Sequence, residues 1–310
     1  MAAIDCGTNS IRLLVADVPP DGGPLVDLSR RMEIVRLGQG VDRTGRLAPE
    51  AIERTRVALA AYAAEASSLG AERMRMVATS ATRDAANADE FRSMVTSTLG
   101  VPPEVVSGDE EARLSYTGAV RGLSPDARPP YLVVDIGGGS TEFVRGGPGG
   151  VDAAISVDIG CVRMTERHLH TDPPTASEIA AAERDVRSAV DRALAAVSGR
   201  GAATLIGLAG SVTTVAAIAL DLPEYQAERI HGARISYDDV AKVTCDLLAM
   251  SAAERRALPV MHPGRADVIG AGALLLRTVM ERAGASSVVA SEHDILDGIA
   301  YGLAEPPAQL

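Results

Sequence analysis

The sequence predicts an α/β protein made of a duplicated domain, and three observations support this. One motif, an apolar strand followed by Asp-x-Gly-x-x-Ser and a second strand, occurs at residues 4–15 and again at residues 131–142. Elsewhere, short β-type runs alternate with segments whose apolar residues have helical spacing. A length of 310 residues also allows two domains, each with its own core.

The second copy of the motif reads Val-Val-Asp-Ile-Gly-Gly-Gly-Ser-Thr-Glu over residues 133–142. Glycine adopts positive φ without steric cost, so the pattern predicts a buried strand, a tight turn and a returning strand. Three residues without Cβ also let a phosphate approach backbone N–H groups, which can form an anion nest. Taken alone, a glycine hairpin of purely structural purpose explains this stretch equally well.

The first copy favours the phosphate loop over the purely structural hairpin, because a shift of 130 positions aligns the Asp, Gly and Ser of the two copies. The residue seven positions after the Asp is Arg12 in the first copy and Glu142 in the second. Strand alternation puts each of them on the same face as the Ser two positions earlier. The repeat therefore predicts two phosphate loops facing each other across a cleft, one with a cation and the other with a second carboxylate.

Composition excludes several classes of protein. The net charge of −11 argues against general nucleic-acid binding, which relies on a basic face. No run approaches the ~18 apolar residues of a membrane helix. The chain enters a strand almost directly, without a secretory n-region, and its three widely spaced cysteines form neither a zinc set nor a disulfide framework. We therefore expect a cytoplasmic protein without nucleic-acid or membrane partners.

The first half predicts a strand at residues 25–37, a helix at 49–69 and a short strand at 74–78. The hydroxyl residues of segment 79–87 are candidates to cap a helix N-terminus. Arg83 within this segment has two interpretations. It is a solvated surface charge, or it is a phosphate clamp assisted by the helix dipole.

Residues 105–113 predict a strand, a turn and the start of a helix. Glu110 and Glu111 fall in its first turn, where acidic residues most simply serve as partners of the helix dipole. Segment 123–130 contains three prolines and is the expected hinge, with the second domain starting at Tyr131.

In the second half we expect strands at residues 151–157, 204–208 and 288–291. We expect helices at residues 161–170, 175–197, 265–281 and 295–303. The glycine-rich junction at residues 207–214 is either a site for a phosphate or ribose or a tight turn into a buried helix. Gly270 and Gly272 are expected to permit close helix packing. We interpret the pair His293-Asp294 as a helix cap, because an HD-type metal phosphohydrolase needs further ligands.

Together these segments closely resemble the exopolyphosphatase and guanosine pentaphosphate phosphohydrolase (Ppx/GppA) family. The matching stretches follow family order, at residues 4–13, 78–87, 107–113, 135–142, 207–213, Ser291 and Asp297-Gly298. The resemblance implies two ribonuclease-H-like domains of the sugar kinase, Hsp70 and actin superfamily, with an active-site cleft between them. Domain I is expected at residues 1–122, with a C-terminal helix at about 293–310 packing back on it, and domain II at 131–292.

The resemblance also implies roles for individual residues. Glu111 resembles the family's general base, with Glu110 the less favoured holder of that role. Asp135 and Glu142 resemble catalytic carboxylates that bind or organise Mg²⁺, with Mn²⁺ as an alternative. Arg83 resembles the arginine that grips the substrate phosphate, so the resemblance replaces the surface interpretation of Arg83 and the dipole interpretation of Glu111. The other expected phosphate-binding residues are Asp5, Gly7, Thr8, Asn9, Ser10, Arg12, Gly137, Gly138, Gly139, Ser140, Thr141, Gly210 and Ser211.

The implied activity is a Mg²⁺-dependent hydrolase acting on inorganic polyphosphate, on guanosine pentaphosphate, or on both, in a cytoplasmic homodimer. A carboxylate would orient and deprotonate the attacking water. Two alternatives stay open: a small-molecule kinase with an adenosine pocket at residues 207–214, and a nucleotide-binding regulatory module without turnover. The sequence departs from the family where residues 294–298 read Asp-Ile-Leu-Asp-Gly in place of the frequent Gly-Leu-Arg-Glu-Gly. It also ends at Leu310, without the helical HD-like region of many relatives, so we expect short polyphosphate substrates.

Overall fold

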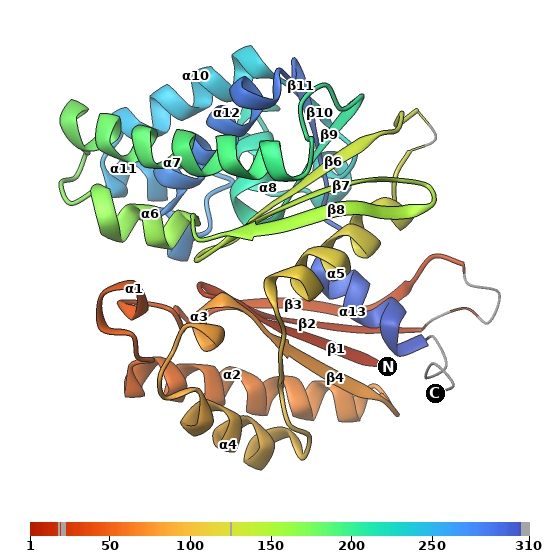
Figure 1. Cartoon of the computed structure of the whole chain (residues 1–310). Coiled ribbons are helices and arrows are strands. Elements are labelled where there is room, and N and C mark those ends of the chain that lie inside the picture. The colour runs from red at the N-terminus through yellow and green to blue at the C-terminus, as the bar shows by residue number, and fades with distance from the viewer. Residues whose placement is uncertain (18, 20–22, 125, 305–310) are drawn as a thin grey trace. The chain divides into compact units, whose positions relative to one another are not determined.

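The chain forms two compact units, each of which is described here by itself (Figure 1). The computed structural model describes residues 1–17, 19, 23–124 and 126–304. Unit 1 comprises Met1–Gly122 together with the segment that begins at Asp294, and unit 2 comprises Leu123–His293. Residue 125 of the expected hinge and residues 305–310 of the expected C-terminal helix lie outside the described residues.

Unit 1 is built on a five-stranded sheet in the order β3-β2-β1-β4-β5. The first three strands, β1 (Ala2–Cys6), β2 (Ser10–Asp17) and β3 (Val26–Ile34), form an antiparallel meander. Strands β4 (Met74–Ala78) and β5 (Glu104–Val105) then add in parallel beside β1. An antiparallel meander continued by parallel strands is the arrangement of a ribonuclease-H-like domain, as the resemblance implied.

Helices cover both faces of this sheet, which explains why its central strands are apolar on both sides. The main helices are α2 (Pro49–Ser68), α4 (Ala88–Leu99), α5 (Gly108–Arg121) and α13 (Ile295–Ala304), and α1 (Val41–Thr44) and α3 (Ser80–Arg83) are short. Ile4 and Leu13 face the core formed with α2 and α4. Ala3 and Leu14, one residue along each strand, face α5 and α13 instead. Asp5 and Arg12 alternate onto this second face.

Helices α5 and α13 cross with their backbones in contact. A Cβ built on Gly118 would lie 1.8 Å from the carbonyl oxygen of Asp294, and one built on Gly298 would lie 2.0 Å from that of Leu114. No side chain fits at either position, so both glycines are required by this crossing. The C-terminal segment is thereby fixed to unit 1.

Unit 2 repeats the same topology in a six-stranded sheet of order β10-β11-β9-β6-β7-β8. Its strands are β6 (Tyr131–Ile136), β7 (Thr141–Gly147), β8 (Gly150–Val157), β9 (Thr204–Leu208), β10 (Arg234–Ser236) and β11 (Ser287–Ala290). Strands β6, β7 and β8 form the antiparallel meander, and β9 and β11 continue the sheet in parallel. Strand β10 is an antiparallel addition at the edge. The duplicated motif therefore belongs to a duplicated fold.

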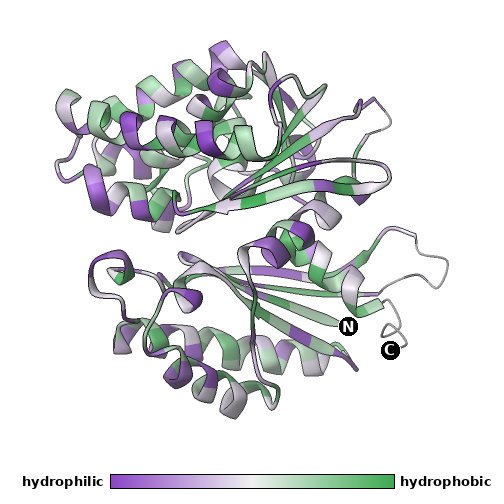
Figure 2. Ribbon diagram, viewed as in Figure 1, coloured by the Kyte–Doolittle hydropathy of each residue, from purple (hydrophilic) through white to green (hydrophobic). Residues whose placement is uncertain are grey.

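The helices of unit 2 are α6 (Cys161–His168), α7 (Ala176–Ala196), α8 (Ala209–Ala219), α9 (Ala227–Ile230), α10 (Tyr237–Ala249), α11 (Ala252–Arg256) and α12 (Ile269–Ala283). Thr175 and Glu178 begin α7 with a capping box, in which each side chain bonds the other residue's backbone N–H. The apolar side of α7 joins the unit's large core, while its other side carries hydrophilic residues (Figure 2).

Three local features bear on the structure expected from the sequence. Helix α12 begins at Ile269 and not at Arg265, because Pro263–Arg265 form a separate 3₁₀ turn. The expected hydroxyl cap at residues 79–87 is wrong, since the N-cap Thr79 makes no side-chain cap bond to α3. The cap interpretation of Asp294 is confirmed, because its Oδ1 accepts from the Leu296 N–H at 3.0 Å.

All three cysteines are free, two of them buried and Cys245 exposed. Among the described residues, no helix combines the length and apolar character needed to cross a membrane.

Candidate active site

The two loops of the repeated motif have the same turn geometry. In unit 1 the Gly7 N–H donates to the Ser10 carbonyl oxygen at 3.0 Å. In unit 2 the Gly137 N–H donates to the Ser140 carbonyl oxygen at 3.1 Å. Each loop is therefore a closed turn between two antiparallel strands, held by its first glycine.

The residues seven positions apart are direct cross-strand partners in both units. Asp5 on β1 is opposite Arg12 on β2, and Asp135 on β6 is opposite Glu142 on β7. Opposed residues of an antiparallel pair have Cβ atoms only about 4.5–5.5 Å apart. Unit 1 thus places a carboxylate beside a guanidinium at its loop, whereas unit 2 places two carboxylates side by side.

The N-terminus of α6 holds the carbonyl groups of the second loop. The donor–acceptor pairs are Cys161 N to Gly137 O (3.0 Å), Val162 N to Gly138 O (2.9 Å), Arg163 N to Gly138 O (3.1 Å) and Arg163 Nε to Gly139 O (2.8 Å). Gly160 lets the two segments approach, since a Cβ there would lie 2.3 Å from the Gly138 carbonyl. The loop is therefore fixed by three backbone N–H groups and by the Arg163 side chain, contacts that the sequence analysis did not anticipate.

This support determines where the loop amides point. In a trans peptide the C=O of one residue and the N–H of the next point in opposite directions. Because the carbonyls of residues 137–139 point at α6, the N–H groups of Gly138, Gly139 and Ser140 point away from it. Successive N–H groups directed to one side form a concave site for an anion.

Unit 1 supports its loop in the equivalent way, with the segment that follows its third strand. The donor–acceptor pairs are Gly38 N to Thr8 O (2.8 Å), Val35 N to Asn9 O (3.1 Å) and Arg36 N to Asn9 O (2.8 Å). Arg36 adopts a positive φ of 51° to make its contact. By the same peptide geometry, the amides of Asn9 and Ser10 point away from the supporting segment.

Two expected phosphate-binding threonines have hydroxyl groups committed to the protein. The Thr141 hydroxyl donates to the Ile159 carbonyl oxygen, and the Thr8 hydroxyl lies 2.9 Å from that of Ser80. Thr141 is fully buried. Any contact of Thr141 with a phosphate would therefore come from its backbone, whereas the Thr8 hydroxyl can still donate to a phosphate when Ser80 is the donor of their pair.

Arg83 and Glu111, expected to have different roles, are in direct contact. Arg83 Nη1 donates to Glu111 Oε2 and to the Val106 carbonyl oxygen, both at 3.0 Å. Glu111 lies at the start of α5 and is 8% exposed. The Glu110 side chain is 45% exposed and lies 3.5 Å from Arg75. The structure thus separates the two neighbouring glutamates, one being buried beside Arg83 and the other at the surface.

Asp135 and Glu142 form a buried pair of carboxylates at the second loop. Their exposed fractions are 7% and 1%, and the Ser156 hydroxyl donates to Glu142 Oε1 at 2.7 Å. Within the described residues, no group of three or more His, Cys, Asp or Glu side chains could hold a metal ion. A cation here would therefore take two protein carboxylates at most and complete its shell with other oxygens.

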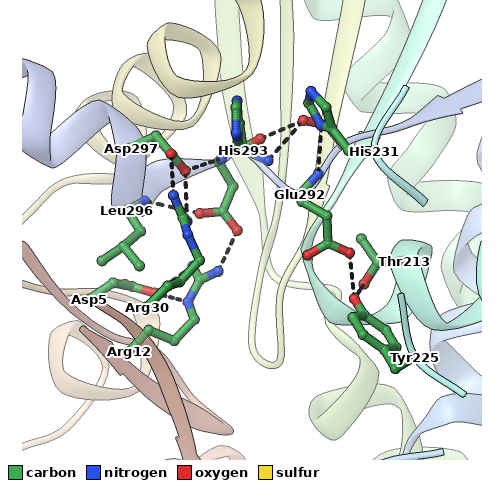
Figure 3. Close-up of polar contacts among 12 residues, drawn as sticks. Asp5, Arg12, Arg30, Thr213, Tyr225, His231, Glu292, His293, Leu296 and Asp297 are labelled. Carbon is green, nitrogen blue, oxygen red and sulfur yellow. Dashed lines mark hydrogen bonds and ion pairs between the residues drawn. The ribbon is translucent and has the colours of Figure 1, made fainter. Parts of the chain in front are cut away.

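Arg12 is engaged by carboxylates on both sides (Figure 3). Its Nε and Nη2 donate to Asp5 Oδ2 at 3.0 and 2.7 Å, and its Nη1 donates to Asp294 Oδ2. Burial raises the pKa of the Asp5 carboxyl above its ordinary value, and the neighbouring Arg12 offsets this only in part. The candidate phosphate cation of the first loop is thus already neutralised within unit 1.

The glycine-rich junction of unit 2 holds an arginine that the sequence analysis overlooked. A Cβ on Gly210 would lie 2.3 Å from Arg265 Cζ, so the guanidinium rests directly on this glycine. Arg265 Nη1 also donates to the Thr214 hydroxyl at 3.3 Å. Ser211 packs against Gly272, where a Cβ would lie 2.3 Å from its Oγ, which confirms close packing at that glycine. The sequence feature that could have drawn attention to Arg265 is its position directly after Pro-Gly, in the 3₁₀ turn.

A second polar cluster of unit 2 lies beside the same junction (Figure 3). The Tyr225 hydroxyl is 2.7 Å from Thr213 Oγ1 and 2.5 Å from Glu292 Oε1. Burial raises the pKa of the Tyr225 phenol, and the neighbouring Glu292 adds to this. The tyrosine is therefore a neutral hydroxyl that connects α8 to the segment after β11.

Two ribonuclease-H-like units, each with a glycine loop whose amides point away from the supporting segment, make this an α/β protein of duplicated fold. The family model of the Ppx/GppA phosphatase family matches residues 14–305, so the chain belongs to this family. The chain is 52% identical to exopolyphosphatase 2 of Mycobacterium tuberculosis over 98% of both chains. Among solved structures, it resembles an exopolyphosphatase-like protein (44% identity, 98% of both chains, TM-score 0.93). It also resembles the Aquifex aeolicus Ppx/GppA family member (31% identity, 97% of this chain and 96% of that one, TM-score 0.81).

Proposed function

We propose that this protein is an exopolyphosphatase, which hydrolyses the terminal phosphoanhydride bond of inorganic polyphosphate and releases orthophosphate. The observation that carries the proposal is the pair of glycine loops whose carbonyls are fixed and whose amides are directed outward. Exopolyphosphatase 2 of Mycobacterium tuberculosis and an exopolyphosphatase-like protein, which both match nearly the whole chain, support this substrate class. Guanosine pentaphosphate ends in the same anhydride linkage and is the second substrate that we propose.

In this reaction water attacks the terminal phosphorus, the bridging oxygen leaves with the shortened chain, and Glu111 accepts the proton of the water. A buried carboxylate is suited to this task because proton acceptance in the transition state requires a positioned base. Arg83 would bind oxygens of the terminal phosphate through its guanidinium fork. The loop amides would bind further phosphate oxygens and add positive partial charge where the transition state is negative.

Asp135 and Glu142 are suited to hold Mg²⁺ or Mn²⁺, because two neighbouring buried carboxylates repel each other and a divalent cation offsets this. Mg²⁺ is commonly held by one or two carboxylates, with water and substrate phosphate completing its octahedral shell. When bound, such an ion neutralises charge on the phosphate oxygens.

We expect Asp135→Asn and Glu142→Gln each to raise the Mg²⁺ concentration needed for half-maximal activity, since each removes one anionic ligand. A Mg²⁺ titration of phosphate release measures this. Asp152→Asn, which alters a carboxylate on β8 outside the loops, is the matched control. If both site variants keep the wild-type metal response, the ion is held by substrate phosphates and this assignment fails.

The test of the function is phosphate release by the purified chain with tripolyphosphate, longer polyphosphate and guanosine pentaphosphate, each with Mg²⁺. Release from at least one polyphosphate is the expected result. ATP with small sugar and acyl acceptors is included, because transfer without phosphate release would identify a kinase. Tight nucleotide binding with no turnover would identify a regulatory module.

A further inference from the structure

Asp294 is an acidic residue for which the proposed reaction has no role. It lies at the start of α13, and its side chain is only 4% exposed. Its Oδ1 caps the helix by accepting from the Leu296 N–H at 3.0 Å, while its Oδ2 accepts from Arg12 Nη1. The two oxygens therefore serve different purposes, one structural and one electrostatic.

The charges around Arg12 do not balance. Three of its N–H donors go to carboxylates, two to Asp5 and one to Asp294. The other acidic residue of this helix start, Asp297, is paired with Arg30 at 2.7 Å, and Arg30 also pairs with Asp27 at 2.8 Å. The group of Arg12, Asp5 and Asp294 thus has one positive and two negative charges when both carboxyls are ionised.

This excess of negative charge would weaken the binding of an anion at the first loop, because Arg12 directly follows that loop on β2. A phosphate gains most from a guanidinium that offers parallel N–H donors. Here both edges of the Arg12 guanidinium already face carboxylates, and Asp5 is fixed as its direct cross-strand partner. Asp294 comes from a different element, so it is the carboxylate that a substitution can remove without altering the strand pair.

We propose that Asp294 competes with substrate phosphate for Arg12 and so sets how tightly the first loop holds its anion. The proposal rests on the polyphosphatase function proposed above. Asp294 acts through Arg12 and does not contact the reacting atoms. Its effect is to keep phosphate affinity moderate, which favours release of product and of shortened chains.

The decisive variant is Asp294→Asn, because asparagine caps a helix about as well as aspartate but carries no charge. We expect the KM for tripolyphosphate to fall about fivefold, which is the difference between a typical charge-assisted and a neutral hydrogen bond. The inhibition constant of inorganic phosphate should fall in parallel. Asp27→Asn is the matched control, since it removes a carboxylate from Arg30 at an exposed position and should leave both constants unchanged.

A double variant isolates the mechanism. Adding Arg12→Gln to Asp294→Asn should abolish the gain in affinity, because the gain requires the freed guanidinium. Asp294→Ser, which is neutral and a good cap, repeats the test should the Asn variant fold poorly, as judged by its Tm. An unchanged or raised KM in a folded Asn or Ser variant would overturn the proposal and leave Asp294 as a cap or a support of Arg12.

Failure of this inference can be told apart from failure of the proposed function. If the wild-type protein releases no phosphate from any polyphosphate, the function fails, and calorimetric titration with tripolyphosphate still measures the affinity of each variant. Equal binding by the wild-type and Asn proteins would then overturn the role of Asp294 as well. Wild-type turnover with no effect of Asp294→Asn overturns the inference alone.

Discussion

At the scale of single residues, the contact between Arg83 and Glu111 links two roles that the sequence left separate. The two side chains are 3.0 Å apart, so the guanidinium holds the Glu111 carboxylate in position at the start of α5. Arg83 would therefore position the proposed base Glu111 while it binds the terminal phosphate.

Glu111→Gln should lower kcat by roughly 10²–10⁴-fold, the usual contribution of a general base. KM should change little, because the base acts in the transition state and not in ground-state binding. Steady-state phosphate release measures both constants. Glu110→Gln is the comparison: loss of kcat in this variant, with Glu111→Gln active, would move the base by one residue to the exposed side chain near Arg75.

Arg83→Lys should raise KM for tripolyphosphate despite keeping the charge, because an ammonium group cannot replace a bidentate fork. Arg56→Lys is the control, since Arg56 is half exposed and pairs locally with Glu53. A wild-type KM in the Arg83 variant would return Arg83 to a structural role.

Contacts within the site were predictable where the two residues are close in the sequence and unpredictable where they are far apart. Strand alternation was enough to place Arg12 beside the first loop, and the structure pairs it with Asp5. Its other partner, Asp294, lies 282 residues away, and no spacing rule connects them. The difference between Glu110 and Glu111 likewise depends on burial by tertiary packing, which a first-turn pattern cannot resolve.

At the scale of elements, the glycine loops depend on segments that the motif does not contain. In both units the support comes from the stretch after the third strand, at residues 35–38 and 160–163. The sequence signal for most of these contacts is weak, because their donors are backbone N–H groups, which every residue except proline has. Gly160 is the exception, since its lack of a Cβ is what allows the approach.

Gly160→Ala tests this support. The added methyl would meet the backbone of Gly138 and Gly139 at 2.3–2.5 Å, and backbone cannot move aside as a side-chain end can. Overpacking of this kind costs about 1–3 kcal/mol. We expect a Tm lower by several degrees and a larger loss of kcat/KM. Gly149→Ala is the control, because nothing lies within 4 Å of its built Cβ. Equal Tm and activity in the two variants would show that α6 does not hold the loop.

At the scale of the whole molecule, the duplication determines how the two loops are built, and the net charge determines which parts of the chain can attract an anion. The repeated topology supplies two loops of the same construction, but the residue seven positions after the aspartate differs between them. The copies have therefore separated into a loop beside a paired arginine and a loop beside two carboxylates. With a net charge of −11 and one lysine in the chain, an anion would be attracted mainly by individual arginines, such as Arg83 beside Glu111, Arg163 at the second loop and Arg265 on Gly210.

The acidic net charge also affects the length of substrate that the protein can hold. Processive cleavage of a long polyphosphate requires many weak cationic contacts, each raising the effective concentration for the next. A strongly acidic protein repels those parts of a long polyanion that lie beyond its local cations. We therefore expect short chains to be preferred and the polymer to be released after one or a few cleavages. Gel analysis of partly digested long polyphosphate should show a gradually shortening ladder. Full-length polymer persisting beside free phosphate, with no intermediate lengths, would contradict it.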